Sequence, residues 1–153
     1  MLGARAIAPR ARISGQDQLA VNRPCEKIFR LGDNSPMNPI LYGIPNCDTV
    51  KKARAWLDSQ GVAYGFHDFK KQAVPLDRLA AWIAAVGLEK LVNRRGPTFR
   101  KLDAATQATL AQPATAKAGM VANSSVIKRP VVEWPSGAIT VGFDAAAWRA
   151  QLP

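Results

Sequence analysis

The stretch ILYGIPNCDTVKKA, residues 40–53, decides the fold of this chain. Its apolar start, Ile40–Ile44, predicts a short strand, and Pro45-Asn46 is a turn that ends the strand. The polar residues that follow the turn predict the first turn of a helix. Cys47 therefore lies between a strand and a helix.

The predicted helix continues to Gly61, and Asn46 or Asp48 can cap its start. Its apolar residues recur at the three-and-four spacing of one buried face, and they are Val50, Ala53, Trp56 and Leu57. Residues 62–69 then alternate in the manner of a half-buried strand. A strand, a helix and a strand in this order favour parallel pairing with a right-handed crossover.

The middle of the chain has helical character. Residues 76–86 carry apolar side chains at helical spacing and end at Gly87. Residues 102–122 are alanine-rich with similar spacing. We therefore expect residues 75–123 to form a helical insert.

The C-terminal part returns to strands. Residues 131–134 and 138–143 are joined by Pro135-Ser136-Gly137, whose residue types suit a tight reversal, so they predict a hairpin. Asp144 can cap a last helix over residues 145–151, with Trp148 as its core anchor. The predicted fold class is α/β, with a mixed four-stranded sheet flanked by helices.

Residues 1–36 contain scattered arginines, glycines and prolines and no sustained apolar period. We expect them to be a disordered or non-native N-terminal extension, in which Cys25 is an incidental thiol. Met37 stands immediately before the first strand. One folded domain is therefore expected over residues 37–153.

The composition, 48% hydrophobic and 21% charged, is typical of a globular domain. No apolar run reaches the roughly 18 to 20 residues of a membrane span. The N-terminus also lacks the apolar core of a secretory signal, so we expect a cytoplasmic protein. The formal net charge is +10, but no RNA-binding aromatic motif, zinc-ligand spacing or basic helical repeat accompanies it. This argues against nucleic acid as a partner.

Cys47 is the candidate reactive group. Unpaired backbone N–H groups and the helix dipole favour negative charge at a helix start, so they stabilise a thiolate there. Packing as a small buried hydrophobic residue is the alternative, but the polar flanking residues favour partial exposure. A dithiol site would need a second cysteine where Val50 stands. Any disulfide formed by Cys47 is thus a mixed disulfide that an outside thiol must resolve.

Three ordered motifs resemble the arsenate reductase-like family of thioredoxin-fold proteins. They are residues 42–53, Asn93-Arg94-Arg95-Gly96 and Ile127-Lys128-Arg129-Pro130. The resemblance covers the chain from Met37 to its C-terminus, and it implies a thioredoxin-like fold with Arg129 beside Cys47 and a cis peptide bond before Pro130. The family includes glutathione- and glutaredoxin-dependent arsenate reductases, thiol-reductase-like proteins and regulators that bind RNA polymerase.

Departures from the family pattern bear on the substrate. Arsenate reductases follow the cysteine with Gly-Thr-Ser-Arg, where this chain has Asp48-Thr49-Val50-Lys51. Of the three arginines that hold the oxyanion in those enzymes, Arg129 matches one. The first falls at Asn93 or Arg94, depending on register, and the third falls near Gly142, where no cation exists. The chain thus looks closest to the thiol-reductase-like branch, for which glutathione is the expected reducing co-substrate.

We predict that Cys47 and Arg129 are catalytic. The residues predicted to bind substrate lie in or near the three motifs, and they are Asn46, Thr49, Lys51, Asn93, Arg94, Arg95, Arg100 and Pro130. Glutathione is a net anion at neutral pH, so the lysine and the arginines can bind its carboxylates. No bound cofactor or metal is expected.

Two other functions stay open. One is glutaredoxin-coupled arsenate reduction. The other is an oxidant-sensing regulator that binds RNA polymerase, although such regulators commonly carry a Cys-x-x-Cys switch that Val50 removes here. His67, the single histidine, is expected to be a strand residue and not a catalytic base. We expect a monomer.

Overall fold

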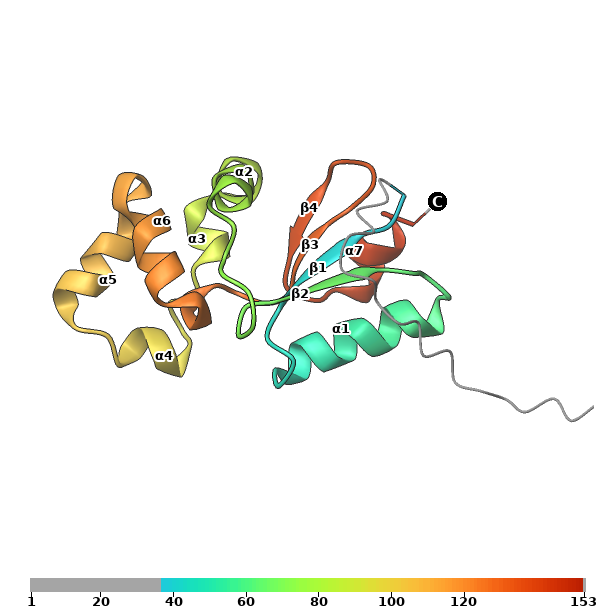
Figure 1. Cartoon of the computed structure of the whole chain (residues 1–153), viewed down its shortest axis with the longest axis horizontal. Helices are drawn as coiled ribbons and strands as arrows, with labels where there is room; N and C mark the ends of the chain where they lie inside the picture. Colours follow the sequence, from blue (N-terminus) through green and yellow to red (C-terminus); the bar gives the residue numbers. More distant parts are fainter. Residues whose placement is uncertain (1–36, 153) are drawn as a thin grey trace, which may run out of the picture.

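A computed structural model describes residues 37–152 and contains one mixed sheet (Figure 1). Its strands are β1 (Ile40–Gly43), β2 (Gly65–Asp68), β3 (Val131–Glu133) and β4 (Ile139–Val141), in the order β2-β1-β3-β4. Strand β1 pairs parallel with β2 and antiparallel with β3, and β3 forms an antiparallel hairpin with β4. The predicted fold class, with its parallel unit and its hairpin, is confirmed.

One face of the sheet is covered by α1 (Asp48–Ser59) and α7 (Ala145–Arg149). Successive residues of a strand point to opposite faces, so Leu41 of β1 packs toward these two helices. Trp148 of α7, only 1% exposed, packs in the same cluster, as the sequence predicts.

The opposite face is covered by α2 (Leu76–Val86). Tyr42 points to this side and meets the ring of Trp82 edge-on at a centroid distance of 4.7 Å. The Trp82 indole N–H donates a 2.7 Å hydrogen bond to one oxygen of Glu133, and the Tyr42 hydroxyl donates a 3.1 Å bond to the other. These two bonds attach α2 to strands β1 and β3.

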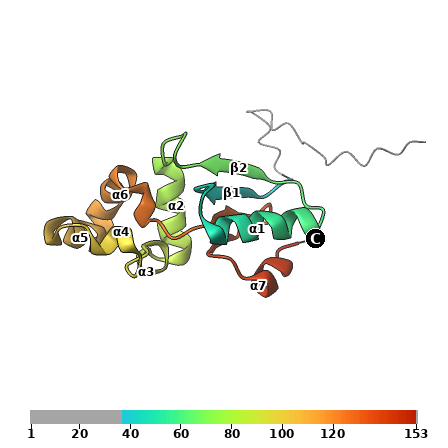
Figure 2. The same cartoon turned by 90° about the horizontal axis from the view of Figure 1, so that it is seen from below.

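The rest of the helical insert extends away from the sheet beyond α2, as both Figure 1 and Figure 2 show. It comprises α3 (Leu88–Leu91), α4 (Pro97–Arg100), α5 (Ala104–Ala111) and α6 (Pro113–Ala122), followed by a 3-10 turn at Ser124–Val126. The alanine-rich stretch is thus two helices. Pro113 is the first residue of α6, a position where its missing N–H costs nothing.

Several element bounds differ from the sequence prediction. Strands β2 and β4 are shorter than residues 62–69 and 138–143, because regular pairing lasts only as long as the neighbouring strand offers partners. Helix α7 ends at Arg149, two residues before the predicted end. Asp144 does cap it, because its Oδ1 accepts hydrogen bonds from the N–H groups of Ala146 and Ala147.

The start of α1 corrects the capping prediction. Cys47 itself is the N-cap residue, with extended backbone angles, while Asp48 is already the first helical residue and Asn46 belongs to the preceding turn. The predicted caps were wrong by one residue on either side. Within residues 37–152, no helix is long and apolar enough to cross a membrane.

Helix α1 lies close to β1 because position 43 carries no side chain. A Cβ atom on Gly43 would lie 2.9 Å from Cγ2 of the fully buried Val50. Real Cβ atoms do not approach carbon so closely, so any side chain here would push α1 away from the strand. The close approach fixes the turn that carries Cys47.

We therefore expect Gly43→Ala to lower the free energy of unfolding by about 1–3 kcal/mol through overpacking. Urea denaturation of the Gly43→Ala, Val50→Ala and double variants checks this. The double variant should lose less than the sum of the two single losses, since each change relieves the other. Strict additivity would contradict the contact.

Candidate functional site

Cys47 is held in place by the backbone on both sides. Its N–H donates a 3.1 Å hydrogen bond to the carbonyl of Ile44, which closes the turn after β1, and its carbonyl accepts a 2.9 Å bond from the N–H of Lys51. The side chain is partly exposed and is a free thiol. The sulfur therefore sits at the N-terminus of α1 and remains open to solvent.

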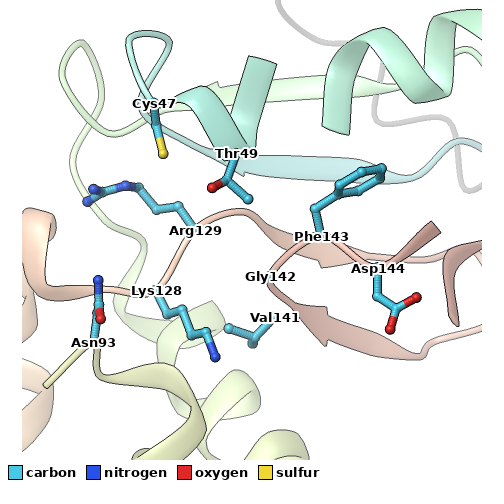
Figure 3. Close-up of a pocket in the computed structure, with 9 residues that line it drawn as sticks. All are labelled: Cys47, Thr49, Asn93, Lys128, Arg129, Val141, Gly142, Phe143 and Asp144. Atoms are coloured by element: carbon cyan, nitrogen blue, oxygen red, sulfur yellow. The ribbon is translucent and has the colours of Figure 1, made fainter. Parts of the chain in front are cut away.

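Arg129 approaches the cysteine from the segment that enters β3. The peptide bond between Arg129 and Pro130 is cis, as the family resemblance implies. One guanidinium nitrogen, Nη1, donates a 2.9 Å hydrogen bond to the carbonyl of Ser125. The side chain extends toward the sulfur of Cys47, as Figure 3 shows.

The Nε atom of Arg129 is buried and has no hydrogen-bond partner among residues 37–152. An unpaired buried donor costs free energy, and native structures satisfy most such groups. An anionic acceptor in the pocket would relieve this cost. Arg129 is thus suited to hold a negatively charged group close to the cysteine.

The surroundings of Cys47 lower the pKa of its thiol below the ordinary value. Partial burial is the largest single effect and raises the pKa, because it penalises the charged form. The backbone N–H of Val50, the Arg129 side chain, the N–H of Thr49 and the positive charge of Arg129 together outweigh it. The thiolate is therefore the favoured nucleophilic form at lower pH than for a free cysteine.

Cys47 and Arg129 open onto a pocket of about 430 Å³ (Figure 3). This volume lies within the usual range for small-molecule sites, roughly 300–1,000 Å³. The wall combines the turn before α1, the segment before β3 and the end of β4; its residues are Cys47, Thr49, Asn93, Lys128, Arg129, Val141, Gly142, Phe143 and Asp144. The arrangement can present an anion to the thiolate.

The structure brings only some of the predicted residues to this pocket. Thr49 and Asn93 line it with the two predicted catalytic residues. Pro130 is buried behind the wall. The remaining predicted residues are exposed but do not line this pocket, and they are Asn46, Lys51, Arg94, Arg95 and Arg100.

Arg94 and Arg95 line a second pocket of about 330 Å³, together with Glu89, and this pocket shares Asn93 and Lys128 with the first. Of the two residues left open at the Asn-Arg-Arg-Gly motif, Asn93 lines both pockets, whereas Arg94 lines only the second.

Gly96 explains part of this motif. A Cβ atom at position 96 would lie 2.7 Å from Nδ2 of Asn93 and 3.2 Å from its carbonyl oxygen. The absence of a side chain therefore allows Asn93 to hold its position. The N–H of Gly96 also donates a 3.1 Å hydrogen bond to the Asn93 carbonyl, which closes the turn.

Sequence reasoning missed five lining residues, namely Lys128, Val141, Gly142, Phe143 and Asp144. Lys128 was the easiest to find, because it precedes Arg129 in the third motif. Asp144 was expected only as a helix cap, and Gly142 only as a position without a cation. The side-chain direction of Lys128 depends on its distant neighbours and has no local sequence signal.

His67 lies in β2, as expected, away from the cysteine pocket. Its Nε2 lies 3.0 Å from the carbonyl of Ala73, and its ring packs 5.1 Å from that of Tyr42. The part of the chain that the structure describes contains no cluster of three or more histidine, cysteine or acidic residues that could hold a metal ion.

These features define an α/β protein with an activated cysteine, Cys47, at a helix N-terminus. The model of the ArsC family matches residues 42–151, so the chain belongs to that family. The resemblance seen in the three motifs is confirmed, and the fold is that of an arsenate reductase-like thiol oxidoreductase.

Solved structures and curated proteins agree with this assignment. A structure named YFFB protein is 47% identical, covers 76% of this chain and all of its own, and has a TM-score of 0.71. An arsenate reductase (ArsC) related protein from Brucella melitensis is 43% identical over 74% of this chain and 93% of its own, with a TM-score of 0.59. An uncharacterized protein of Haemophilus influenzae is 34% identical over 72% of this chain and 95% of its own.

A second group of relatives carries a different name. The global transcriptional regulator Spx of Streptococcus mutans is 26% identical over 74% of this chain and 82% of its own. The similarity thus extends from proteins named for arsenate reductase to proteins named for transcriptional control.

Arg129→Ala should slow alkylation of Cys47 at pH 7 by about tenfold, because the lost charge favours the protonated thiol. The rate of reaction with iodoacetamide, followed from pH 4 to 10 in a Cys25→Ala background, checks this. In the parent protein the alkylation rate should rise with pH, and the midpoint of this rise should lie at a pH below the free-thiol pKa of about 8.5.

Lys70→Ala is the matched control, because it removes the same charge from an exposed position after β2. Its profile should match the parent. An unchanged profile for Arg129→Ala would show that this arginine does not act on the thiolate. Equal shifts in both variants that salt removes would indicate only the general field of a basic protein.

Proposed function

We propose that the protein is a glutathione-dependent thiol reductase in which the Cys47 thiolate is the nucleophile. The observation that carries the proposal is the position of this sulfur, at the start of α1 and opposite Arg129. Backbone N–H groups and a guanidinium stabilise the thiolate there, and the pocket leaves it accessible.

The reaction that fits this site is exchange with a glutathione mixed disulfide. The Cys47 thiolate attacks the glutathione sulfur, a new S–S bond forms, and the former partner leaves as a thiolate that takes up a proton. A second glutathione thiolate then attacks the mixed disulfide. Oxidised glutathione leaves, and the Cys47 thiolate is restored.

The thiol that resolves the mixed disulfide in the second step must belong to another molecule, because Cys47 is the single cysteine among residues 37–152. Val50, at the position of a dithiol partner, is fully buried and packs against β1. A free thiol such as glutathione, or a glutaredoxin that carries one, is the resolving agent that such a site needs.

The charges of the pocket support an anionic substrate. Arg129 faces the sulfur and has a buried unpaired donor, and Lys128 lies on the same wall. A carboxylate bound by arginine gains a charge-assisted hydrogen bond, about twice as strong as a neutral one. Glutathione brings two carboxylates with its thiol.

Arsenate reduction is the weaker alternative for this site. In the arsenate reductases that the sequence resembles, three arginines hold the oxyanion, whereas only Arg129 is an arginine on this pocket wall. Gly142 offers no side chain where the third would stand. The relatives named global transcriptional regulator Spx favour a further candidate, a transcriptional regulator. The family resemblance implies that such a regulator binds RNA polymerase, which needs no reactive cysteine.

A coupled assay with glutathione, glutathione reductase and glutaredoxin tests the proposal by comparing a glutathione mixed disulfide with arsenate. We expect turnover of the disulfide that Cys47→Ser abolishes and Cys25→Ala leaves unchanged, because only the activated thiolate attacks.

Faster turnover of arsenate than of the disulfide would contradict the proposal and indicate that the protein is an arsenate reductase. Capture of RNA polymerase by a Cys47→Ser variant, with no thiol turnover by the parent, would favour the regulator.

A further inference from the structure

Lys128 fills the space beside Gly142 in the cysteine pocket. Its Cε atom lies 3.8 Å from the point where a Cβ of residue 142 would stand, which is ordinary van der Waals contact. In Figure 3 the Lys128 side chain extends toward Gly142 and Val141, whereas Arg129 extends toward Cys47. The two neighbouring cations thus reach different parts of one pocket.

The backbone at position 142 disfavours a side chain of its own. Gly142 has a φ of +84°, a conformation that residues with a Cβ rarely adopt. Its N–H donates a 2.8 Å hydrogen bond to the carbonyl of Pro130, which ties this conformation to the segment next to Arg129. A cation at this place must therefore come from another part of the chain.

Contacts with the helical insert hold the backbone of Lys128 in place. Its N–H donates a 2.7 Å hydrogen bond to the carbonyl of Leu91, and the preceding Ile127 forms an antiparallel bridge with Val92. The side chain is exposed and makes no salt bridge with any residue of the described 37–152 stretch. Asp144 shares the pocket, but its Oδ1 is engaged by two N–H groups of α7.

We propose that Lys128 is the second anion-binding residue of the Cys47 pocket and selects substrates that carry a carboxylate close to the reacting sulfur. This inference rests on the proposed function in one respect only, which is that glutathione is the substrate. Lys128 also lines the adjoining pocket, where it, Arg94 and Arg95 outnumber the single carboxylate of Glu89, so an extended anionic thiol can continue from the first pocket into the second.

The proposed role separates Lys128 from Arg129. The groups that lower the pKa of Cys47 are backbone N–H groups of α1 and Arg129. Lys128 should instead attract charged reagents without changing the thiolate itself. A lysine at this wall therefore affects the choice of substrate and not the nucleophile.

Two small alkylating reagents of similar size but different charge test the role of Lys128 without glutathione. Iodoacetate is an anion and iodoacetamide is neutral, and both alkylate a thiolate. In a Cys25→Ala background, Lys128→Gln should lower the iodoacetate-to-iodoacetamide rate ratio about three- to tenfold at low salt, because a positive charge that attracts the anion to the pocket wall is lost. The iodoacetamide rate alone should not change, which also shows that the site is intact.

Lys128→Arg should keep the ratio of the parent, because it restores the charge. Lys90→Gln removes an exposed lysine of α3 that does not line the cysteine pocket, so it should also keep that ratio. A ratio that falls no more in Lys128→Gln than in Lys90→Gln would overturn the inference.

Disulfide reagents separate this inference from the proposed function. The parent should react faster with oxidised glutathione than with neutral bis(2-hydroxyethyl) disulfide, and Lys128→Gln should lose most of that preference. If the parent shows no preference, the glutathione proposal fails, while the iodoacetate ratio still decides the role of Lys128. If the preference survives in Lys128→Gln, this lysine does not select the substrate.

Discussion

The antiparallel pairing of β1 with β3 is the constraint on which the site depends. Tyr42 stands opposite Val131, so the chain that leaves β1 and the chain that enters β3 lie at the same end of the sheet. Cys47 follows β1 after a short turn, and Arg129 comes two residues before β3 begins. Two residues far apart in sequence thus meet because the register of one strand pair places them at one edge.

The reactivity of Cys47 is a balance between burial and stabilisation of charge. Burial is the largest effect on its pKa and opposes ionisation, while first-turn N–H groups and Arg129 favour the thiolate more strongly in sum. A deeper position would raise the cost of charge, and full exposure would weaken the interaction with Arg129 through solvent screening. The partly buried N-cap position satisfies both conditions.

The helical insert is joined to the sheet and to the segment that precedes β3, and both links matter for the pocket. Glu133 accepts a hydrogen bond from the buried indole of Trp82, which holds α2 on the sheet. Val92 bridges Ile127, and the N–H of Asn93 donates a 2.8 Å bond to the carbonyl of Val126. Because Asn93 and Lys128 flank this bridge, the insert supplies one wall of the cysteine pocket.

Local sequence patterns determined the elements and the placement of the nucleophile. The run from Ile40 to Ala53 predicted a strand, a turn and a helix with Cys47 at its start, and Asp144 predicted the cap of α7. Such features depend on the hydrophobic period and on hydrogen bonds within a few residues, both of which are written in contiguous sequence. The three motifs added Arg129 through their family resemblance.

Only the tertiary structure decided which cations share the pocket with the sulfur. Lys51, Arg94 and Arg100 were plausible by charge and by proximity to the motifs, yet none lines that pocket. Lys128 does, because hydrogen bonding to Leu91 fixes its backbone and the bare Cα of Gly142 leaves room for its stem. The direction of a long charged side chain is set by distant segments packed around it, and contiguous sequence does not encode those neighbours.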